Sequence, residues 1–320
     1  MSFANFTRFE VDTGDARIAG LQGGSGPGLL LLHGHPQTHM IWHRLAERLA
    51  EHFTVILTDL RGYGASSKPR AQTAANPRDQ GALLSAHKGG EAPPPAVAHD
   101  LYSKRAMAAD QVAVMQHLGF DKFLVCAHDR GARVAHRMAL DYPDQVERLM
   151  LLDIAPTLEM YENTDRAFAT AYFHWFFLIQ PEPLPETLLA AAPVVYLERV
   201  MGNRHGGLEK FAPEALAAYK QAFADPATIH AICEDYRASA TIDLERDRDD
   251  VERGHKVACP LRILWGEYGV IEQCFEPLEA WRRVARDVSG RALACGHYIP
   301  EEAPDALYDE ILSFFEAQAN

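Results

Sequence analysis

The 320-residue sequence lacks long hydrophobic runs and is poor in basic residues. No apolar stretch approaches the roughly 18 residues that a membrane span needs. The N-terminus has no basic start followed by an apolar segment, so a signal peptide is not expected. Lys and Arg number 31 against 44 Asp and Glu, and the net charge of −13 disfavours nucleic acid or an anionic membrane as a partner. We therefore expect a cytoplasmic protein that binds neither.

Cysteines are also few and are not paired in the sequence. The five are odd in number, scattered and without a Cys-x-x-Cys motif, so neither a disulfide framework nor a zinc site is expected. We predict that the protein needs no metal and no organic cofactor. The cysteines are Cys126, Cys233, Cys259, Cys274 and Cys295.

Short apolar, partly β-branched runs alternate with helical patterns through the first half of the chain. Such runs are typical of parallel strands that are buried on both faces. The expected strands are 29–32, 53–58, 122–127, 148–152, 261–265 and 291–294. The expected helices are 41–50, 103–118, 131–141 and a final helix with Leu307, Ile311, Phe314 and Phe315 on one face.

The stretch from residue 157 to residue 253 has helix formers and aromatics but no clear strand run. An alternation of strands and helices that is interrupted by a helical insert and then resumes predicts an α/β fold. We expect a mostly parallel sheet flanked by helices, with a core domain of 1–156 and 254–320 and a helical cap domain of 157–253. Residues 71–99, rich in Ala, Pro and Gly, predict an irregular surface loop.

The clearest local motif is Ala127-His128-Asp129-Arg130-Gly131, between an expected strand and an expected helix. Small residues flank its centre by two positions on each side, which is typical of the tight turn called a nucleophile elbow. A carboxylate at its centre suits displacement of a leaving group from an sp³ carbon, with an ester intermediate. An alternative interpretation is that Asp129 only caps the helix N-terminus.

Two further motifs support the nucleophile interpretation. His33-Gly34-His35-Pro36 follows the strand 29–32, where this architecture places its oxyanion hole, with backbone N–H groups of His35 and Arg130 as the expected donors. Gly296-His297 follows the last strand, where a general base is expected. The acid that orients His297 is either Asp153, which ends the strand 148–152 and is favoured, or Glu267 after the next strand.

Several segments together resemble the fluoroacetate (haloacetate) dehalogenases of the α/β-hydrolase superfamily, and the resemblance covers nearly the whole chain except 71–99. It implies the α/β-hydrolase fold, hydrolytic dehalogenation of small 2-haloacids to 2-hydroxy acids, and a homodimer. The segments are 58–64, 102–108, 126–134, 167–177 and 235–245. Segment 58–64 is shared with epoxide hydrolases and is weakly specific.

The resemblance also implies roles for individual residues. Arg130 and Arg133 would hold the substrate carboxylate, which fits the planar fork that Arg presents. His174, Trp175 and Tyr236 would receive the halide, although a pattern of aromatics alone favours a packed core. The sequence departs from the family at His35, where an aromatic Phe is usual, and at 201–207, which has no tryptophan. Both departures predict a wetter or roomier pocket and leave larger or chlorinated acids open.

Three other functions remain open at this point. An epoxide hydrolase shares the fold and the Asp nucleophile and needs tyrosines as proton donors, but a neutral epoxide gives an arginine pair no purpose. A metal-dependent hydrolase could use the nearby histidines, although no acidic partners lie beside them in sequence. A non-catalytic receptor would leave the complete triad unexplained. The histidines in question are His33, His35, His39 and His43.

Overall fold

The computed structural model describes residues 3–70 and 97–316, within which eight strands form one sheet in the order β1-β2-β4-β3-β5-β6-β7-β8. β1 pairs antiparallel with β2, β2 pairs antiparallel with β4, and all pairs from β4 to β8 are parallel. The strands are β1 (Thr7–Asp12), β2 (Arg17–Gly24), β3 (Gly28–Leu32), β4 (Thr54–Thr58), β5 (Phe123–His128), β6 (Val146–Leu152), β7 (Leu261–Gly266) and β8 (Val288–Leu293).

Helices cover both faces of this sheet. In β3 the side chains alternate between two hydrophobic clusters, with Leu30 and Leu32 in one and Leu29 and Leu31 in the other. A strand whose two faces are both buried has no polar face, so β3 is an unbroken apolar run. The covering elements are η1 (His39–Trp42), α1 (Ala46–Leu49), η2 (Val97–Tyr102), α3 (Lys104–His117), α4 (Asp129–Asp141), α13 (Val270–Cys274), α14 (Pro277–Val284), α15 (Ile299–Glu302) and α16 (Pro304–Phe315).

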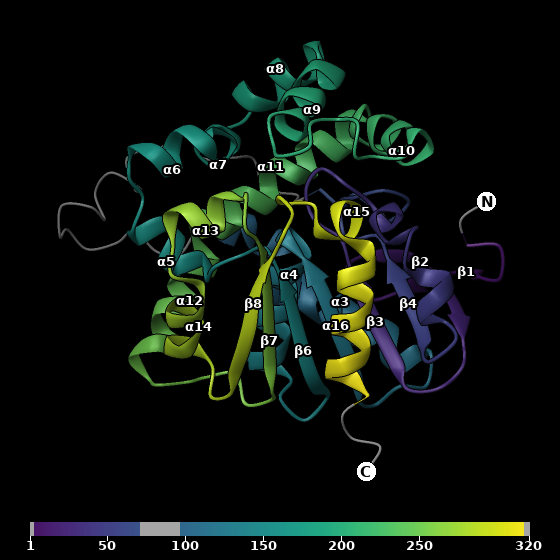
Figure 1. Cartoon of the computed structure of the whole chain (residues 1–320). Coiled ribbons are helices and arrows are strands. Elements are labelled where there is room, and N and C mark those ends of the chain that lie inside the picture. The colour runs from purple at the N-terminus through teal and green to yellow at the C-terminus, as the bar shows by residue number, and fades with distance from the viewer. Residues whose placement is uncertain (1–2, 71–96, 317–320) are drawn as a thin grey trace.

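The chain between β6 and β7 forms a helical insertion. Most of it lies over the end of the sheet at which the parallel strands finish (Figure 1). In the described part of the chain no helix combines the length and the apolar character needed to cross a membrane. The division of the chain into a core domain and a cap domain remains a prediction. The helices of the insertion are α5 (Thr157–Glu162), α6 (Arg166–Ala171), α7 (Phe173–Leu178), α8 (Leu184–Ala191), α9 (Pro193–Gly202), α10 (Pro213–Phe223), α11 (Pro226–Ala240) and α12 (Ile242–Glu252).

The predicted α/β class, with its mostly parallel sheet and inserted helices, is confirmed. The single helix expected at 41–50 is wrong: the chain forms the short η1 and α1 instead. The Thr38 side chain caps a tight first turn, and Ile41 and Trp42 are both buried although they are adjacent, which tightened turns allow. The hairpin of β1 and β2 was not predicted. Residues 71–96 of the expected loop lie outside the described residues.

The parallel strands bring four chain segments to one edge of the sheet. Carboxyl ends of parallel strands meet at the same edge, and ligands of open α/β sheets bind there. His35 follows β3, Asp129 follows β5, Asp153 follows β6 and His297 follows β8. Residues that are up to 262 positions apart in the chain are thereby gathered under the helical insertion.

Candidate active site

Asp129 is the first residue of α4 and sits in a strained turn. Its φ of +46° lies in the left-handed region, which costs an L-residue about 1–2 kcal/mol. The Gly131 backbone N–H donates to the His33 carbonyl at 2.9 Å and holds the turn against the loop after β3. A Cβ on Gly131 would lie 2.4 Å from that oxygen, and a Cβ on Gly34 would lie 2.4 Å from the Asp129 Cβ. Both glycines are therefore required by close approach.

The buried Asp129 carboxylate is held in its charged form. Burial alone would raise its pKa, but the interactions with His297, His128 and the arginines of α4 outweigh burial and lower it below the usual range of an aspartate. The His35 backbone N–H donates to Asp129 Oδ1 at 2.9 Å, which also favours the anion. The side chain is thus ionised, desolvated and suited to act as a nucleophile.

His297 and Asp153 form a buried hydrogen-bonded pair. His297 Nδ1 lies 2.5 Å from Asp153 Oδ2, and Asp153 Oδ1 accepts the Gly266 N–H at 2.9 Å. Burial lowers the pKa of His297 well below 6.5, so its imidazole is neutral. Because Asp153 engages Nδ1, Nε2 is the ring nitrogen left to accept a proton. The alternative partner Glu267 has an exposed side chain. The structure therefore brings Asp153 to His297.

Arg130 is fully buried and is largely neutralised by Asp235 of α11. Its Nε and Nη2 donate to the two carboxylate oxygens at 3.0 and 2.8 Å, and Nη2 also reaches Ser239 Oγ at 2.6 Å. Asp235 additionally pairs with Lys104 and accepts the Tyr63 hydroxyl at 2.7 Å. Arg130 Nη1 remains buried without a hydrogen-bond partner. One of its donors is therefore available to a ligand.

Arg133 is buried among neutral acceptors. Its Nη1 donates to the Ala155 carbonyl at 3.2 Å and to Thr157 Oγ1 at 2.8 Å, and its Nη2 lies 3.1 Å from Met160 Sδ. Within residues 3–70 and 97–316 it forms no ion pair, and its Nε has no partner. Burial, together with the like charge of Arg130, lowers the pKa of Arg133. The guanidinium thus lacks a directly bonded counter-ion.

The aromatic residues predicted for halide binding lie against these arginines. The Arg130 Cζ atom is 4.1 Å from the Tyr236 ring centroid, and the Arg133 Cζ atom is 4.6 Å from the Trp175 ring centroid. The Tyr236 ring lies 6.4 Å from that of Trp175 and 5.9 Å from that of His174. Both the Trp175 Nε1 and the Tyr236 hydroxyl are buried without a hydrogen-bond partner. The expected carboxylate and halide residues are therefore brought together.

His35, from the loop after β3, lies against two of these aromatic residues. Its ring stacks on His174 with centroids 6.0 Å apart and meets Tyr236 edge-on at 5.4 Å. Burial lowers the pKa of His35 to about 3, so its imidazole is neutral, and its Nε2 lies 3.4 Å from the Tyr196 hydroxyl. At the position where the family usually has Phe, this chain therefore has a neutral and buried imidazole.

Comparison with known proteins agrees with this architecture. The family model of the alpha/beta hydrolase fold matches residues 27–240. The chain belongs to the α/β-hydrolase family. It is 42% identical to a fluoroacetate dehalogenase of Burkholderia sp. over 95% of this chain and 91% of the relative. It is 32% identical to a soluble epoxide hydrolase of Corynebacterium sp. (strain C12) over 91% of each chain. The crystal structure of an α/β hydrolase from Nostoc sp. PCC 7120 superposes with a TM-score of 0.88 at 51% identity, over 98% and 99% of the two chains.

Reasoning from the sequence missed several residues of this α/β-hydrolase site. The sequence analysis gave Asp235 no role, because its pairing with Arg130 is visible only in the tertiary structure. The Tyr161 hydroxyl is buried without a partner, and its ring lies 5.0 Å from that of Trp175. Arg204 lies with its Cζ 4.4 Å from the Tyr172 ring centroid. No spacing rule places residues from separate helices of the insertion together.

The histidines considered as metal ligands have separate partners. His33 Nε2 accepts the Leu60 N–H at 3.0 Å, His39 Nδ1 lies 2.8 Å from an Asp59 oxygen, and His43 Nδ1 lies 2.9 Å from a backbone carbonyl. Among the described residues, the group of three potential metal ligands whose ligand atoms all lie within 4.8 Å of one another consists of Glu182, Glu186 and His230 in the insertion. The alternative of a hydrolase with a histidine-bound metal therefore loses its basis.

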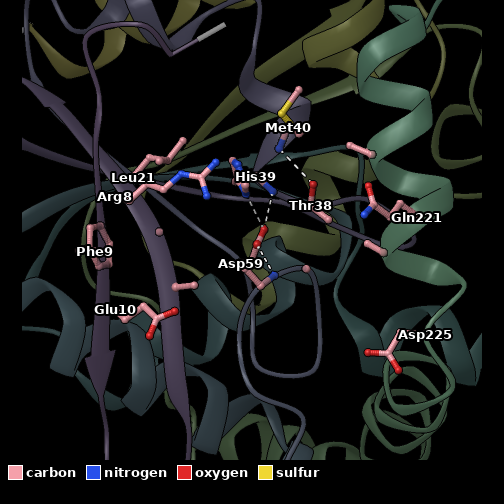
Figure 2. A pocket seen from close by; sticks show the side chains of 16 residues that line it. Arg8, Phe9, Glu10, Leu21, Thr38, His39, Met40, Asp59, Gln221 and Asp225 are labelled. Carbon is pink, nitrogen blue, oxygen red and sulfur yellow. Dashed lines mark hydrogen bonds and ion pairs between the residues drawn. The ribbon is translucent and has the colours of Figure 1, made fainter.

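A cleft of about 870 Å³ opens beside η1, and Asp129, Asp153 and His297 are not among the residues that line it (Figure 2). Its Asp59 carboxylate points toward His39 and already accepts the backbone N–H groups of His39 and Ala65, each at 2.8 Å. Those bonds explain Asp59 as a structural residue of the loop after β4. The residues predicted as nucleophile and base, Asp129 and His297, lie elsewhere.

The close approach of Gly34 and Asp129 yields a first prediction. Gly34→Ala should lower hydrolytic activity by about a hundredfold, because the new Cβ must displace the Asp129 side chain. Ser25→Ala, at an exposed position between β2 and β3, is the control. Steady-state rates and circular dichroism would be measured for both. Activity of the Gly34 variant within threefold of the wild-type rate would show that Asp129 does not depend on this contact.

The charge pairing of Asp235 yields a second prediction. Asp235→Asn leaves the buried Arg130 and Lys104 without their counter-charge, so the free energy of unfolding should fall by about 3 kcal/mol. Urea unfolding measures this change. The control is Asp309→Asn at an exposed position of α16, which should change stability by no more than about 0.5 kcal/mol. Equal stability of the two variants would contradict the proposed pairing.

Proposed function

We propose that this α/β hydrolase removes halide from small 2-haloacids, such as fluoroacetate and chloroacetate, and releases the 2-hydroxy acid. In this reaction Asp129 is the nucleophile, His297 is the base and Asp153 orients the base. Arg130 and Arg133 hold the substrate carboxylate, while His174, Trp175 and Tyr236 receive the halide. The proposal requires neither a metal nor an organic cofactor.

One observation carries the proposal: Arg133 is buried next to the nucleophile without a directly bonded carboxylate. A buried charge is costly unless it is paired. A substrate carboxylate would supply the missing counter-charge, and the free Nε of Arg133 and Nη1 of Arg130 would donate to it. Hydrogen bonds to charged groups contribute about 1.5–3 kcal/mol each. A neutral substrate would make less use of these two N–H donors.

In the first step an Asp129 carboxylate oxygen attacks the α-carbon, and the carbon–halogen bond breaks with its electron pair on the halide. The unpartnered Trp175 N–H and Tyr236 O–H lie beside the arginines, and they would donate hydrogen bonds to the departing anion. Burial raises the pKa of the Tyr236 hydroxyl well above 10, so it stays protonated as a donor. The product of this step is an ester of Asp129.

In the second step water attacks the carbonyl carbon of the Asp129 ester. His297 Nε2 takes a proton from the water, and Asp153 stabilises the resulting imidazolium. The His35 backbone N–H, which already reaches Asp129 Oδ1, would stabilise the oxyanion. Collapse of the tetrahedral intermediate returns the alkoxide oxygen to the product, which accepts the proton. The released alcohol therefore contains an oxygen from Asp129.

Epoxide hydrolysis remains the second candidate function. The Tyr236 and Tyr161 hydroxyls are both buried without partners, and either could protonate an epoxide oxygen. The relative named soluble epoxide hydrolase supports this alternative. The relative named fluoroacetate dehalogenase has the higher identity and, together with the uncompensated Arg133, favours dehalogenation. A direct comparison of chloroacetate with styrene oxide tests the two.

The ester intermediate yields a third prediction. His297→Asn should release about one equivalent of halide from chloroacetate and then stop, because the ester forms but water is no longer activated. Mass spectrometry should find the carboxymethyl group on the peptide that contains Asp129. His117→Asn at an exposed position is the control and should turn over normally.

The same variant distinguishes the alternatives. An Asp129 ester formed from styrene oxide but not from chloroacetate would establish the epoxide reaction and refute dehalogenation. One equivalent of halide with an unmodified Asp129 peptide would refute the covalent mechanism.

The buried base yields a fourth prediction, on pH. The unprotonated imidazole is the active form, and burial lowers the pKa of His297, so the base stays active to lower pH than an exposed histidine would. Formation of the ester removes the Asp129 charge, whose effect is to raise that pKa. Ester hydrolysis in single-turnover experiments should be constant from about pH 9 to pH 7 and reach half its maximum below pH 6.5. A midpoint above pH 6.5 would refute this assignment.

A further inference from the structure

Arg204 is a second cation of the site that lacks a paired carboxylate. It follows α9 in the insertion and is partly buried, with its Cζ 4.4 Å from the Tyr172 ring centroid. Within residues 3–70 and 97–316, Arg204 forms no ion pair, although neighbouring residues such as His205 and Lys210 do. The Tyr172 side chain hydrogen-bonds to Arg204 and the charge of Asp153 acts on it. In a chain of net charge −13, a partly buried arginine that is not ion-paired with any carboxylate is unexpected.

The loop that carries Arg204 is fixed to the loop that carries the base. The neighbouring His205 packs so closely on Gly296 that a Cβ there would lie 2.6 Å from the His205 Cβ. Glu302 joins the two loops, because one of its oxygens lies 2.9 Å from His205 Nδ1 and accepts the Gly296 N–H at 2.7 Å. Gly296 directly precedes His297 in the sequence. The backbone at Arg204 is therefore held beside the catalytic base.

The Arg204 side chain faces the reaction site and is separated from the carboxylate arginines by aromatic rings. The Tyr172 ring against which it lies stacks on His174 at 5.3 Å and meets Trp175 at 5.8 Å. The Arg133 Cζ atom lies 4.6 Å from the Trp175 ring centroid. The charge of Arg204 also lowers the pKa of both His174 and His297, after the larger effect of burial. Of the neighbouring Trp175 and Tyr172 rings, one is thus contacted by Arg133 and the other by Arg204.

We infer that Arg204 is a specificity-determining residue that binds a second anionic group, so that the preferred substrates are 2-haloacids with a second carboxylate. This inference rests on the proposed function, because it takes Arg130 and Arg133 as the site of the first carboxylate. Arg204 would pair with the distal carboxylate through the planar fork that suits such groups. The chemistry at the α-carbon is unchanged.

Two pairs of acids test the inference, each pair differing mainly in the second carboxylate. They are 2-chlorosuccinate with 2-chlorobutanoate, and 2-chloroglutarate with 2-chloropentanoate. The wild-type chain should have the higher kcat/KM for the dicarboxylate in at least one pair. In Arg204→Gln the ratio of kcat/KM for dicarboxylate over monocarboxylate should fall by about tenfold or more, as expected for a lost charged hydrogen bond. Arg204→Lys, which keeps the charge without the fork, should retain part of the preference.

Arg199→Gln is the matched control, because it removes an exposed arginine of α9 and makes the same change in net charge. Its ratio should equal that of the wild type. The ratio within one variant cancels any general loss of activity caused by altered His297 chemistry. A ratio that Arg204→Gln leaves unchanged, or a wild-type preference for the monocarboxylates in both pairs, would overturn the inference.

Binding of unreactive acids separates this inference from the proposed function. Titration calorimetry with succinate and butanoate should show tighter binding of succinate to the wild type and loss of that difference in Arg204→Gln. If the chain releases no halide from any acid but retains this binding difference, the proposed reaction is wrong and the anion site stands. If halide is released while succinate and butanoate bind equally, the reaction stands and the anion site is wrong.

Discussion

The site depends on one interaction, the compensation of a buried carboxylate at Asp129. A carboxylate removed from water normally takes up a proton, because its charged form loses more solvation than its neutral form. Here the His35 N–H, the arginines of α4 and the nearby imidazoles offset that loss. The tight turn between β5 and α4 makes this possible by bringing the side chain to the sheet edge at a positive φ. The two glycines and the positive charges are therefore consequences of one requirement.

The same requirement explains why the two arginines of α4 have different surroundings. If both were fully paired, as Arg130 nearly is by Asp235, little positive charge would remain for Asp129 or for a substrate. If neither were paired, their mutual repulsion in a buried space would be severe. The structure neutralises Arg130 and leaves Arg133 with neutral acceptors. Under the proposed function, a substrate carboxylate would supply the directly bonded anion that Arg133 lacks.

Local patterns in the sequence were sufficient for the strands that are buried on both faces and for the elbow. The hairpin of β1 and β2 escaped prediction because β1 is largely exposed and β2 contains glycines such as Gly20 and Gly23, so neither is an apolar run. Asp153 followed from its place at the end of a strand. The pairing of Asp235 with Arg130 and the position of Arg204 could not be predicted, because both depend on how separate helices pack over the sheet.

The division of labour between sheet and insertion has a consequence for specificity. The edge of the sheet supplies the residues proposed for bond making, whereas the insertion supplies Trp175, Tyr236 and Arg204. A change in the insertion can therefore alter which leaving group or substituent fits without disturbing Asp129 or His297. Relatives with dehalogenase and epoxide hydrolase names, both aligned along more than nine-tenths of this chain, are what such an arrangement allows. Under the proposed function, Arg133, which has no directly bonded carboxylate, would distinguish an acid from an epoxide.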